Sequence, residues 1–577
     1  MSSFSLEDKE DISIVLCGAA GQGIKTVEQF LTQVLFEDGY NVAATKEYMS
    51  RVRGGTNSTE IRISSKRVSA FVDRIDIFIP LNKTAIARQR KRITADTIII
   101  GEPENISNEI DISNHKVIEI SWSKIAAEIG NKIYSNVIAA GLIAELFRLD
   151  REIGKKYLSD RFASKGEKVI ENNFKAFNKG CEIADEIINE KGLKISIKKN
   201  PKIKKMAMYD GASVIGMGAV AGGCNFICSY PMSPSTGVLV FLAKHSDEFE
   251  ILVEQAEDEI AAINAGLGAA YAGARALVST SGGGLALMGE GISLSGIIET
   301  PIVIHVAQRP GPATGLPTRT EQGDLELVLY SGHGDFPRII LAPGSLEDAF
   351  AVTQQAFNMA EKYQTPVIIL TDQFFMDLYY NFPPPDISQF SIENTVVKTT
   401  KDYQRYKLTK DGISPRGIPG HGEGLIRADS DEHDEDGFIT EDLDGMRIKM
   451  VEKRLNKLDL IKKNVLPPDL IGNKDYKTLV IGWGSTFTAI KEALAEIGRD
   501  DISFLYYKQV YPVHPDTEKM LKKANKVIIV ENNVTSQFGK LIHLFAGVKI
   551  EHKILKFNGM PFSVEELVER ITKIVEA

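Results

Sequence analysis

The chain has 577 residues, 43% of them hydrophobic and 25% charged, which is the balance of an ordinary globular protein. At about 150 residues per domain, this length predicts three or four domains. The net charge of −9 argues against a protein that grips nucleic acid through its phosphates. No apolar run approaches the ~18 residues needed to span a bilayer, and the first residues are acidic where a signal peptide is basic. We therefore expect a cytoplasmic protein with neither nucleic acid nor a membrane as partner.

The four cysteines are too few for a disulfide framework in a chain of this length, which predicts a reducing compartment. Their spacing does not fit an iron–sulfur cluster. They are Cys17, Cys181, Cys224 and Cys228.

The first stretch, residues 1–192, opens like a βαβ unit. It has an apolar strand at 12–17, a glycine-rich turn at 18–23 and an amphipathic segment at 26–37. The turn departs from the dinucleotide fingerprint at Ala20, so a plain tight turn and an anion site at the helix start are equally good interpretations of it. Residues 51–55, Arg-Val-Arg-Gly-Gly, are either a second phosphate contact or a basic surface loop. Further strands are expected at 75–81, 97–100 and 117–120.

A basic segment, residues 193–207, is expected to link this domain to a second α/β domain at 208–382. The apolar runs of the second domain alternate with helical patterns, which predicts a mostly parallel sheet covered on both faces. Residues 383–470 are polar and lack periodicity, and such long connections are usually functional or wrap a partner. A third α/β domain is expected at 471–577. The strands expected in the second domain are 225–229, 251–253, 276–279, 301–306, 338–341 and 366–371.

Two motifs do not support the chemistry that they first suggest. Residues 429–437 resemble a calcium loop, but Leu443 stands where the bidentate glutamate belongs, so an exposed acidic loop is preferred. Ser281 lies between a strand and a helix like a hydrolase nucleophile, but Ser279 stands where the elbow needs glycine. The turn at 281–284 is instead expected to pack closely against a ligand or a neighbouring backbone.

Two charged residues follow expected strands, where α/β proteins bind ligands. Glu259 opens a helix rich in Ala and Gly, and it is either a ligand contact or an acid that interacts with the helix dipole. Arg309 begins a Pro- and Gly-rich loop, and it is either a carboxylate contact or a solvated cation.

Together these pieces resemble a known family, the fused γ–α subunit of the 2-oxoacid:ferredoxin oxidoreductases, most of all the 2-oxoglutarate type. The resemblance spans nearly the whole chain and implies three α/β domains: a γ-type Rossmann-like domain, a thiamine-diphosphate pyrimidine-binding domain and a transketolase C-terminal-like domain. It rests on residues 18–23 with 51–55, on 230–236, 254–270, 281–284 and 308–324, on 412–420 with 432–435, and on 531–533 with Gln537.

The resemblance implies the chemistry and the site. The family decarboxylates a 2-oxoacid on thiamine diphosphate, passes electrons through iron–sulfur clusters to ferredoxin and releases an acyl-CoA. By position, Glu259 would hydrogen-bond the aminopyrimidine of the cofactor, Arg309 would neutralise the substrate carboxylate, and Ser233 would contact substrate or cofactor. The remaining implied residues are Tyr230, Pro231 and Arg319 beside the cofactor, and Gly21, Gln22 and Gly23 toward coenzyme A.

The chain departs from the family pattern at two places. Met232 and Ser233 replace the usual Ile-Thr, and Ser536 stands where glycine is usual. Serine keeps the hydroxyl of threonine but loses the methyl group that stiffens its rotamer.

The resemblance also implies a partner. Thiamine enzymes hold the diphosphate and magnesium through a Gly-Asp-Gly motif, which this sequence lacks. We therefore expect no metal in this chain, and a β subunit that shares the thiamine diphosphate and carries Mg²⁺ and a [4Fe-4S] cluster. The assembly would be an (αβ)₂ complex that uses ferredoxin and is inactive without β. A sibling enzyme for branched-chain oxoacids or pyruvate, and a non-catalytic scaffold subunit, remain as alternatives.

Overall fold

The computed structural model describes residues 4–19, 24–49, 55–106 and 114–577. The chain forms two compact units, residues 1–209 with 378–384 and residues 210–377 with 385–577. Both units combine helices with strands, so the expected α/β class is confirmed. Within the described residues, no helix is both long and apolar enough to cross a membrane.

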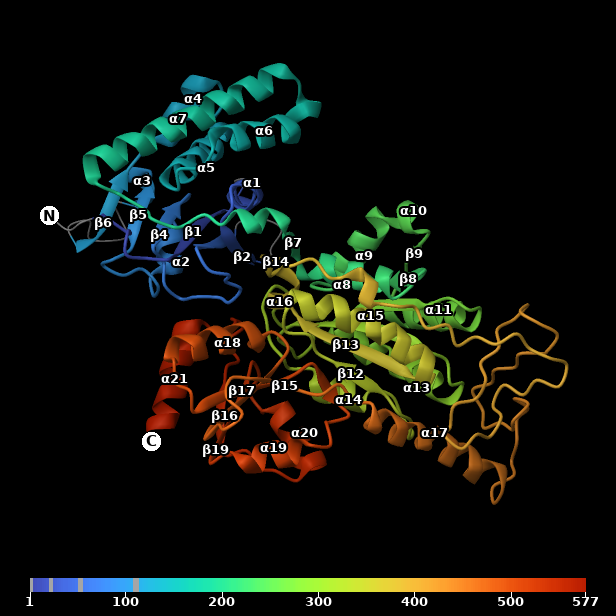
Figure 1. Ribbon diagram of the computed structural model, residues 1–577. Coiled ribbons are helices and arrows are strands. Elements are labelled where there is room, and N and C mark those ends of the chain that lie inside the picture. The colour runs from blue at the N-terminus through green and yellow to red at the C-terminus, as the bar shows by residue number, and fades with distance from the viewer. Residues whose placement is uncertain (1–3, 20–23, 50–54, 107–113) are drawn as a thin grey trace. The chain divides into compact units, whose positions relative to one another are not determined.

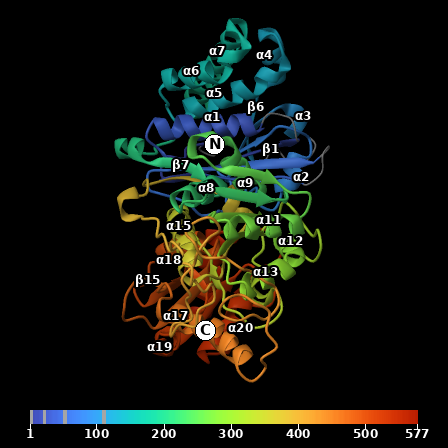
Figure 2. The same cartoon turned by 90° about the vertical axis from the view of Figure 1, so that its right-hand side faces the viewer.

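The first unit is built on a mixed sheet of eight strands in the order β6-β5-β4-β1-β3-β2-β14-β7. Helix α1 (Ile24–Glu37) packs against β2 and β3, with α5 (Ser135–Leu146) and α6 (Arg151–Phe162) on its other side; α7 (Glu167–Lys191) packs against α5 (Figures 1 and 2). The strands are β1 (Asp11–Ala19), β2 (Asn41–Glu47), β3 (Thr56–Ser64), β4 (Ile77–Pro80), β5 (Ile98–Gly101), β6 (Lys116–Glu119), β7 (Ala207–Asp210) and β14 (Tyr379–Phe382).

The opening of this unit differs from a simple βαβ unit. β3 lies between β1 and β2 and is antiparallel to both. Neither β2 nor β3 was expected, because polar residues interrupt their apolar pattern. Glu60 and Arg62 of β3 are nevertheless buried, with Glu60 paired to Arg92 and Arg62 paired to Asp11.

The basic segment that was expected to link two domains runs along the first unit. Ile195 forms a β-bridge with Leu6, and Asn200 donates its backbone N–H to the Gly39 carbonyl at 2.7 Å. The lysines of this segment are mostly exposed, while Ile197 and Ile203 are buried.

The second unit contains a seven-stranded sheet in the order β18-β12-β13-β11-β10-β8-β9. The six strands from β12 to β9 run parallel to one another, as expected from the alternation of strands and helices. They begin and end within two residues of the expected apolar runs. They are β8 (Phe226–Ser229), β9 (Leu252–Gln255), β10 (Ala276–Thr280), β11 (Ile302–Gln308), β12 (Ile339–Leu341) and β13 (Pro366–Asp372).

Helices cover this sheet. α11 (Glu259–Tyr271), α12 (Gly282–Leu287) and α13 (Gly289–Ile297) pack on one face, where Ile302, Ile304 and Val306 join their core. α8 (Gly211–Ala221) and α15 (Leu346–Tyr363) pack against each other and cover the other face (Figure 1).

The C-terminal part of the second unit has its own five-stranded sheet, in the order β15-β17-β16-β19-β20. A further strand of this part, β18 (Gln509–Tyr511), pairs antiparallel with β12 of the larger sheet. One hydrophobic core therefore runs through both sheets, from Ile304 to Trp483. The five strands are β15 (Asp469–Ile471), β16 (Thr478–Trp483), β17 (Ile502–Tyr507), β19 (Lys526–Glu531) and β20 (His552–Leu555).

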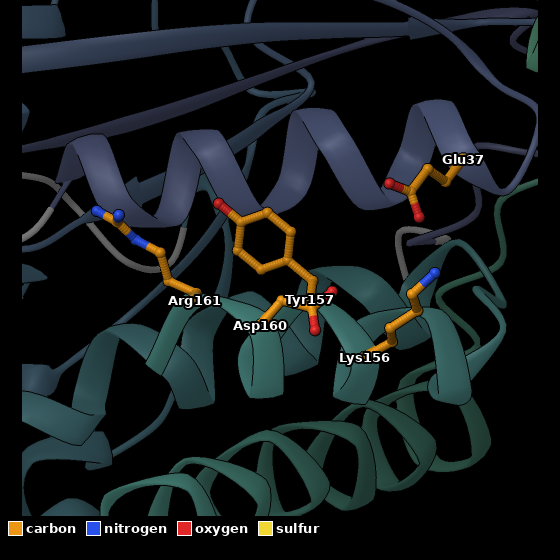
Figure 3. Close-up of a pocket in the computed structure, with 5 residues that line it drawn as sticks. All are labelled: Glu37, Lys156, Tyr157, Asp160 and Arg161. Atoms are coloured by element: carbon orange, nitrogen blue, oxygen red, sulfur yellow. The ribbon is translucent and has the colours of Figure 1, made fainter. Parts of the chain in front are cut away.

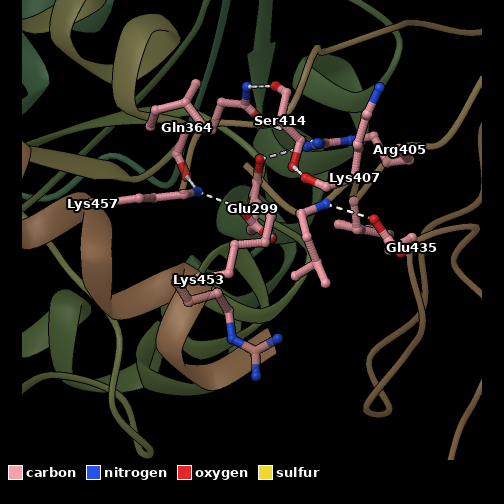
Figure 4. Close-up of polar contacts among 12 residues, drawn as sticks. Glu299, Gln364, Arg405, Lys407, Ser414, Glu435, Lys453 and Lys457 are labelled. Carbon is pink, nitrogen blue, oxygen red and sulfur yellow. Dashed lines mark hydrogen bonds and ion pairs between the residues drawn. The ribbon is translucent and has the colours of Figure 1, made fainter. Parts of the chain in front are cut away.

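The long polar connection contains a helix that the sequence did not predict, α17 (Met446–Lys463). Its buried positions recur at helical spacing, but several of them carry charge, which hides the apolar periodicity. Lys453 and Lys457 both contact the carboxylate of Glu299, and Arg405 donates to the Glu299 backbone carbonyl at 2.7 Å (Figure 4).

The acidic segment within this connection, residues 429–437, was expected to be an exposed loop, but it is partly buried. His433 is fully buried, and its ring stacks on Tyr406 with the centroids 3.9 Å apart. Glu432 pairs with Arg454 at 2.9 Å, and Glu435 accepts the backbone N–H of Leu408. These acids carry hydrogen bonds that order the connection, which charge density alone does not predict.

Candidate active site

The predicted site residues of the second unit lie where its parallel strands end. The loop 230–236 follows β8, Glu259 comes four residues after β9, Ser281 follows β10 and Arg309 follows β11. Because β9, β8, β10 and β11 are adjacent and parallel, all four segments meet at one edge of the sheet. This is where ligands bind in open α/β sheets.

Glu259 is buried, and one of its two carboxylate oxygens lacks a hydrogen-bond partner within the described part of the chain. It is 3% exposed, and no hydrogen-bond partner for its Oε1 atom is found among the described residues. Capping of α11 is done by the neighbouring Asp258, whose carboxylate accepts the Ala261 N–H at 2.7 Å. The N-cap residue is therefore Asp258. Glu259 lies in the first turn of α11, where its charge can also interact with the helix dipole, but its buried Oε1 has no hydrogen-bond donor among the described residues.

The glycine turn explains how Glu259 fits. A Cβ atom at Gly284 would lie 2.7 Å from Glu259 Oε1, so any side chain there would displace the acid. A Cβ at Gly282 would overlap the carboxylate of Asp324. The turn packs closely, as expected, but against side chains rather than a neighbouring backbone: Thr280 and Glu259 at Gly284, and Asp324 at Gly282. Asp324 was not singled out from the sequence.

Arg309 is half-buried, and its Nη1 donates to the Ser233 carbonyl at 2.8 Å. Burial lowers the pKa of Arg309, an effect that the carboxylates of Asp324 and Glu259 oppose. Because the contact uses the backbone of Ser233, it does not depend on serine or threonine at this position. Tyr230 is exposed and Pro231 is half-buried in the same loop, and the Ser281 hydroxyl donates to Met232 Sδ.

Buried polar side chains within the strands form hydrogen bonds that connect neighbouring strands close to this edge. His305 of β11 bridges Ser279 of β10, at 3.0 Å from Nδ1, and Thr371 of β13, at 2.9 Å from Nε2. Gln308 donates to the Thr371 carbonyl and accepts the Asp324 N–H. Burial lowers the pKa of His305 to about 3, so the ring stays neutral and ties the strands together. The sequence did not predict this role, because a single histidine within an apolar strand does not indicate which strands lie beside it.

Arg319 lies against the C-terminal part of the second unit, where its Nη1 is 3.8 Å from Met560 Sδ. Nearby, the buried carboxylate of Glu531 accepts five hydrogen bonds, from Trp483, Asn533, Ser536, Phe538 and Gly539. Ser536 has a φ of +56°, which explains why glycine is usual there, and its hydroxyl donates to Glu531 at 2.9 Å.

The predicted coenzyme A contacts Gly21, Gln22 and Gly23 lie outside the described residues, as do residues 51–54. β1 ends at Ala19 and α1 begins at Ile24, so a strand precedes these residues and a helix follows them. A groove of about 380 Å³ between α1 and α6 is lined by none of the predicted site residues (Figure 3). Its lining carries both signs of charge: Glu37, Lys156, Tyr157, Asp160 and Arg161.

Comparison with known proteins gives the class of the protein. A family model described as pyruvate flavodoxin/ferredoxin oxidoreductase, thiamine diP-binding, matches residues 217–453. A second, described as pyruvate ferredoxin/flavodoxin oxidoreductase, matches residues 13–183. The edge that holds Glu259 and Arg309 thus lies in a thiamine-diphosphate-binding region, and the chain is a subunit of a thiamine-dependent oxidoreductase.

Full-length relatives narrow the class to a family. A 2-oxoglutarate:ferredoxin oxidoreductase from Magnetococcus marinus, solved with 2-oxoglutarate, coenzyme A and succinyl-CoA bound, is 31% identical over 98% of this chain and 99% of its own, with a TM-score of 0.92. The 2-oxoacid:ferredoxin oxidoreductase alpha subunit of Saccharolobus solfataricus is 30% identical, covering 98% of both chains. That of a Sulfolobus species is 29% identical over 98% of this chain and 97% of its own. This chain belongs to the 2-oxoacid:ferredoxin oxidoreductase alpha subunits, and the resemblance inferred from its motifs is confirmed.

The residues at the strand ends fit the aminopyrimidine part of thiamine diphosphate. An orphaned buried carboxylate oxygen requires a donor, and a protonated ring nitrogen is one. Glu259 would hold the cofactor here.

Proposed function

We propose that this chain, with a β subunit, catalyses the oxidative decarboxylation of 2-oxoglutarate or a related 2-oxoacid. The 2-oxoacid and coenzyme A yield an acyl-CoA, carbon dioxide, one proton and two electrons, and ferredoxin accepts the electrons. The single observation that carries this proposal is the buried, unpartnered Oε1 of Glu259 at the strand ends of a thiamine-diphosphate-binding region.

When bound, thiamine diphosphate would supply the carbon nucleophile of the reaction. Glu259 would share a hydrogen bond with a nitrogen of the pyrimidine ring, because no other group of the described residues donates to its buried Oε1. A single positioned acid–base group of this kind contributes ~10²–10⁴-fold to a rate.

Arg309 would bind the carboxylate of the 2-oxoacid. Its guanidinium is half-buried and is oriented by the Ser233 carbonyl, so it can offer its remaining N–H groups to an anion. The hydroxyl of Ser233 and the ring of Tyr230 lie in the same exposed loop, where they would contact substrate or cofactor.

The β subunit would pack on the outer face of α11. This face is made of small or apolar side chains at helical spacing: Ile260, Ala261, Asn264, Ala265 and Gly268, all exposed. Ile260 is 52% exposed and Leu287 of α12 is 53% exposed, and nothing lies within 4 Å of a Cβ atom at Gly268. Such a face allows the close approach of another helix. The partner would then supply Mg²⁺, the diphosphate contacts and the [4Fe-4S] cluster beside Glu259.

The first unit would bind coenzyme A through the turn between β1 and α1. The N–H groups at the start of a helix favour a phosphate, and coenzyme A carries several. The related Magnetococcus marinus enzyme was solved with coenzyme A bound.

The test is to produce the chain with its β subunit and to measure viologen reduction that depends on both a 2-oxoacid and coenzyme A. We expect activity with the complex and none with the chain alone. Glu259→Gln should lower kcat at least about a hundredfold, and Glu257→Gln, an exposed acid two residues earlier, should not. Unchanged activity in Glu259→Gln would remove the catalytic assignment.

Substrate choice is decided by the same assay with 2-oxoglutarate, pyruvate and a branched-chain 2-oxoacid. We expect the highest kcat/KM for 2-oxoglutarate. Native mass spectrometry of the complex would report the β subunit, the number of copies of each chain and the bound cofactors together, and a non-catalytic scaffold would carry no thiamine diphosphate.

A further inference from the structure

We propose that Gln308 is a positioning residue that closes the loop carrying Arg309 and so fixes the guanidinium for the carboxylate of the substrate. Gln308 is the last residue of β11, and Arg309 follows it directly. The side chain of Gln308 is fully buried, so it acts through its neighbours and does not touch the substrate. This inference rests on the proposed function, because it takes Arg309 as the group that binds the 2-oxoacid.

The loop that carries Arg309, residues 309–323, is exposed in its middle. Each of residues 311–316 is exposed, so none of them anchors the loop by burial in the core. The Leu316 N–H donates to the Pro310 carbonyl at 3.0 Å, a bond that shapes the loop without attaching it to the sheet. The position of the loop at the strand ends is therefore set mainly by the attachments at its two ends.

Gln308 joins these two ends. Its Oε1 accepts the N–H of Asp324, the first residue after the loop, at 2.9 Å. Its Nε2 donates to the Thr371 carbonyl of the neighbouring strand β13 at 3.1 Å. A backbone N–H can only donate and a carbonyl can only accept, so these two partners allow the side-chain amide one orientation. A single buried amide thus ties both ends of the loop to the sheet.

The far end of the loop is also held by the C-terminal part of the unit. Gln322 is fully buried; its N–H donates to the Asn532 carbonyl at 2.7 Å, and its Oε1 accepts the Asn532 N–H at 2.9 Å. The Nε2 of Gln322 donates to the Trp483 carbonyl at 2.8 Å. Asp324, two residues later, is therefore held in place, and its N–H gives Gln308 a fixed partner.

The guanidinium of Arg309 depends on the position of its own backbone. Its Nη1 donates to the Ser233 carbonyl at 2.8 Å, and a carboxylate must meet the remaining N–H groups in a planar geometry that tolerates little displacement. Without the bonds of Gln308, the backbone of Arg309 is free to shift. The expected defect is weaker binding of the 2-oxoacid, while Glu259, which begins a separate helix, keeps its place.

The experiment uses the complex of this chain with its β subunit. Gln308→Met keeps the length of the side chain and removes both hydrogen bonds. Gln354→Met is the matched control, because Gln354 of α15 is also buried and donates to a backbone carbonyl, that of Ser391, at 2.7 Å. Arg309→Met removes the guanidinium itself. If Gln308→Met does not assemble with β, Gln308→Asn replaces it, because its shorter side chain cannot reach both partners.

For each protein, kcat and KM for 2-oxoglutarate, the urea midpoint and the hydrogen exchange of peptides within residues 309–324 are measured. We expect Gln308→Met to raise KM about five- to tenfold with kcat retained within a few-fold, and to speed exchange in this segment. Gln354→Met should keep the wild-type KM and the wild-type exchange of this segment, even where its urea midpoint falls as far.

A KM and a segment exchange in Gln308→Met equal to those of Gln354→Met would overturn the inference, and so would a loss confined to kcat. An unchanged KM in Arg309→Met, or a wild-type complex without 2-oxoacid-dependent activity, would instead contradict the proposed function. The exchange comparison between the two glutamine variants reports on the loop in either case.

Discussion

Two buried acids of the second unit, Glu299 and Glu259, occupy opposite situations. Glu299 is fully buried, and its carboxylate contacts Lys453 and Lys457 of α17 (Figure 4). Glu259 is also buried, yet one of its oxygens has no donor among the described residues. A buried carboxylate that is paired with cations of its own chain contributes to the stability of the fold. A buried carboxylate oxygen without a partner costs desolvation free energy, and a ligand that donates a hydrogen bond to it would offset this cost.

The Glu299 cluster joins the long connection to the sheet. Burial acts to raise the pKa of Glu299, but Lys457, Lys453 and Arg405 outweigh it and hold the pKa well below its usual range. Burial lowers the pKa of Lys457 to about 8, although Glu299 opposes that shift. The three cations come from residues that are distant in sequence from Glu299, so one acid orders both the polar loop and α17.

The largest effect on stability is expected from breaking this cluster. Glu299→Gln leaves two buried ammonium groups without a counter-charge and should lower the free energy of unfolding by about 3–5 kcal/mol. Urea unfolding of the full chain followed by Trp483 fluorescence, in a Trp122→Phe background, reports on the second unit. Glu290→Gln, an exposed acid on α13 that pairs with His333, is the matched control and should stay within about 0.5 kcal/mol of the wild type. An equal midpoint for both variants would show that the paired acid does not hold the fold.

A second prediction concerns the neutral histidine below the site. His305 keeps a pKa of about 3 in the folded chain, against about 6.5 when unfolded, so the unfolded chain binds the extra proton first as the pH falls. Its contribution is present above pH 6.5 and is lost as the pH falls toward 3. Between pH 7 and 5 the wild type should lose about 2 kcal/mol relative to His305→Gln. His333→Gln, at an exposed position, should track the wild type, and parallel curves for all three proteins would contradict the prediction.

The smallest effect is expected at a third buried acid, Glu531, which accepts five hydrogen bonds. Ser536→Ala removes one of them and keeps the left-handed backbone, so it should cost about 1–2 kcal/mol. Ser536→Gly also loses the bond, but it relieves the backbone strain of about 1 kcal/mol and should lie closer to the wild type. Equal unfolding midpoints for the two variants would show that the φ of +56° carries no cost.

The apolar runs of the sequence predicted the parallel sheet well. The strands ending at Ser229, Thr280 and Gln308 were expected within two residues of their ends, because each is a mostly buried run rich in apolar residues. β3 and α17 were missed for one shared reason: Arg62, Lys453 and Lys457 are buried as ion pairs, and a charged residue on a buried face cannot be recognised from periodicity alone.

The site was predicted in part. Glu259 and Arg309 were singled out because they follow strands. The sequence left Glu259 open between a ligand contact and an acid that interacts with the helix dipole, and Arg309 between a carboxylate contact and a solvated cation. The structure assigns the helix cap to Asp258 and the orientation of Arg309 to the Ser233 carbonyl. Asp324 and His305 were missed, since their importance comes from neighbours on other strands and helices.

Thiamine diphosphate binding, measured by calorimetry in the α–β complex, tests most directly whether the unpaired acid belongs to the cofactor. Wild type, Glu259→Gln and Glu257→Gln are compared, and each variant is also unfolded in urea. We expect Glu259→Gln to bind thiamine diphosphate more weakly than the other two while its unfolding midpoint is not lowered, because the fold does not use this carboxylate. Thiamine diphosphate binding equal to that of the wild type, or a loss of stability like that of Glu299→Gln, would show that Glu259 is a structural acid.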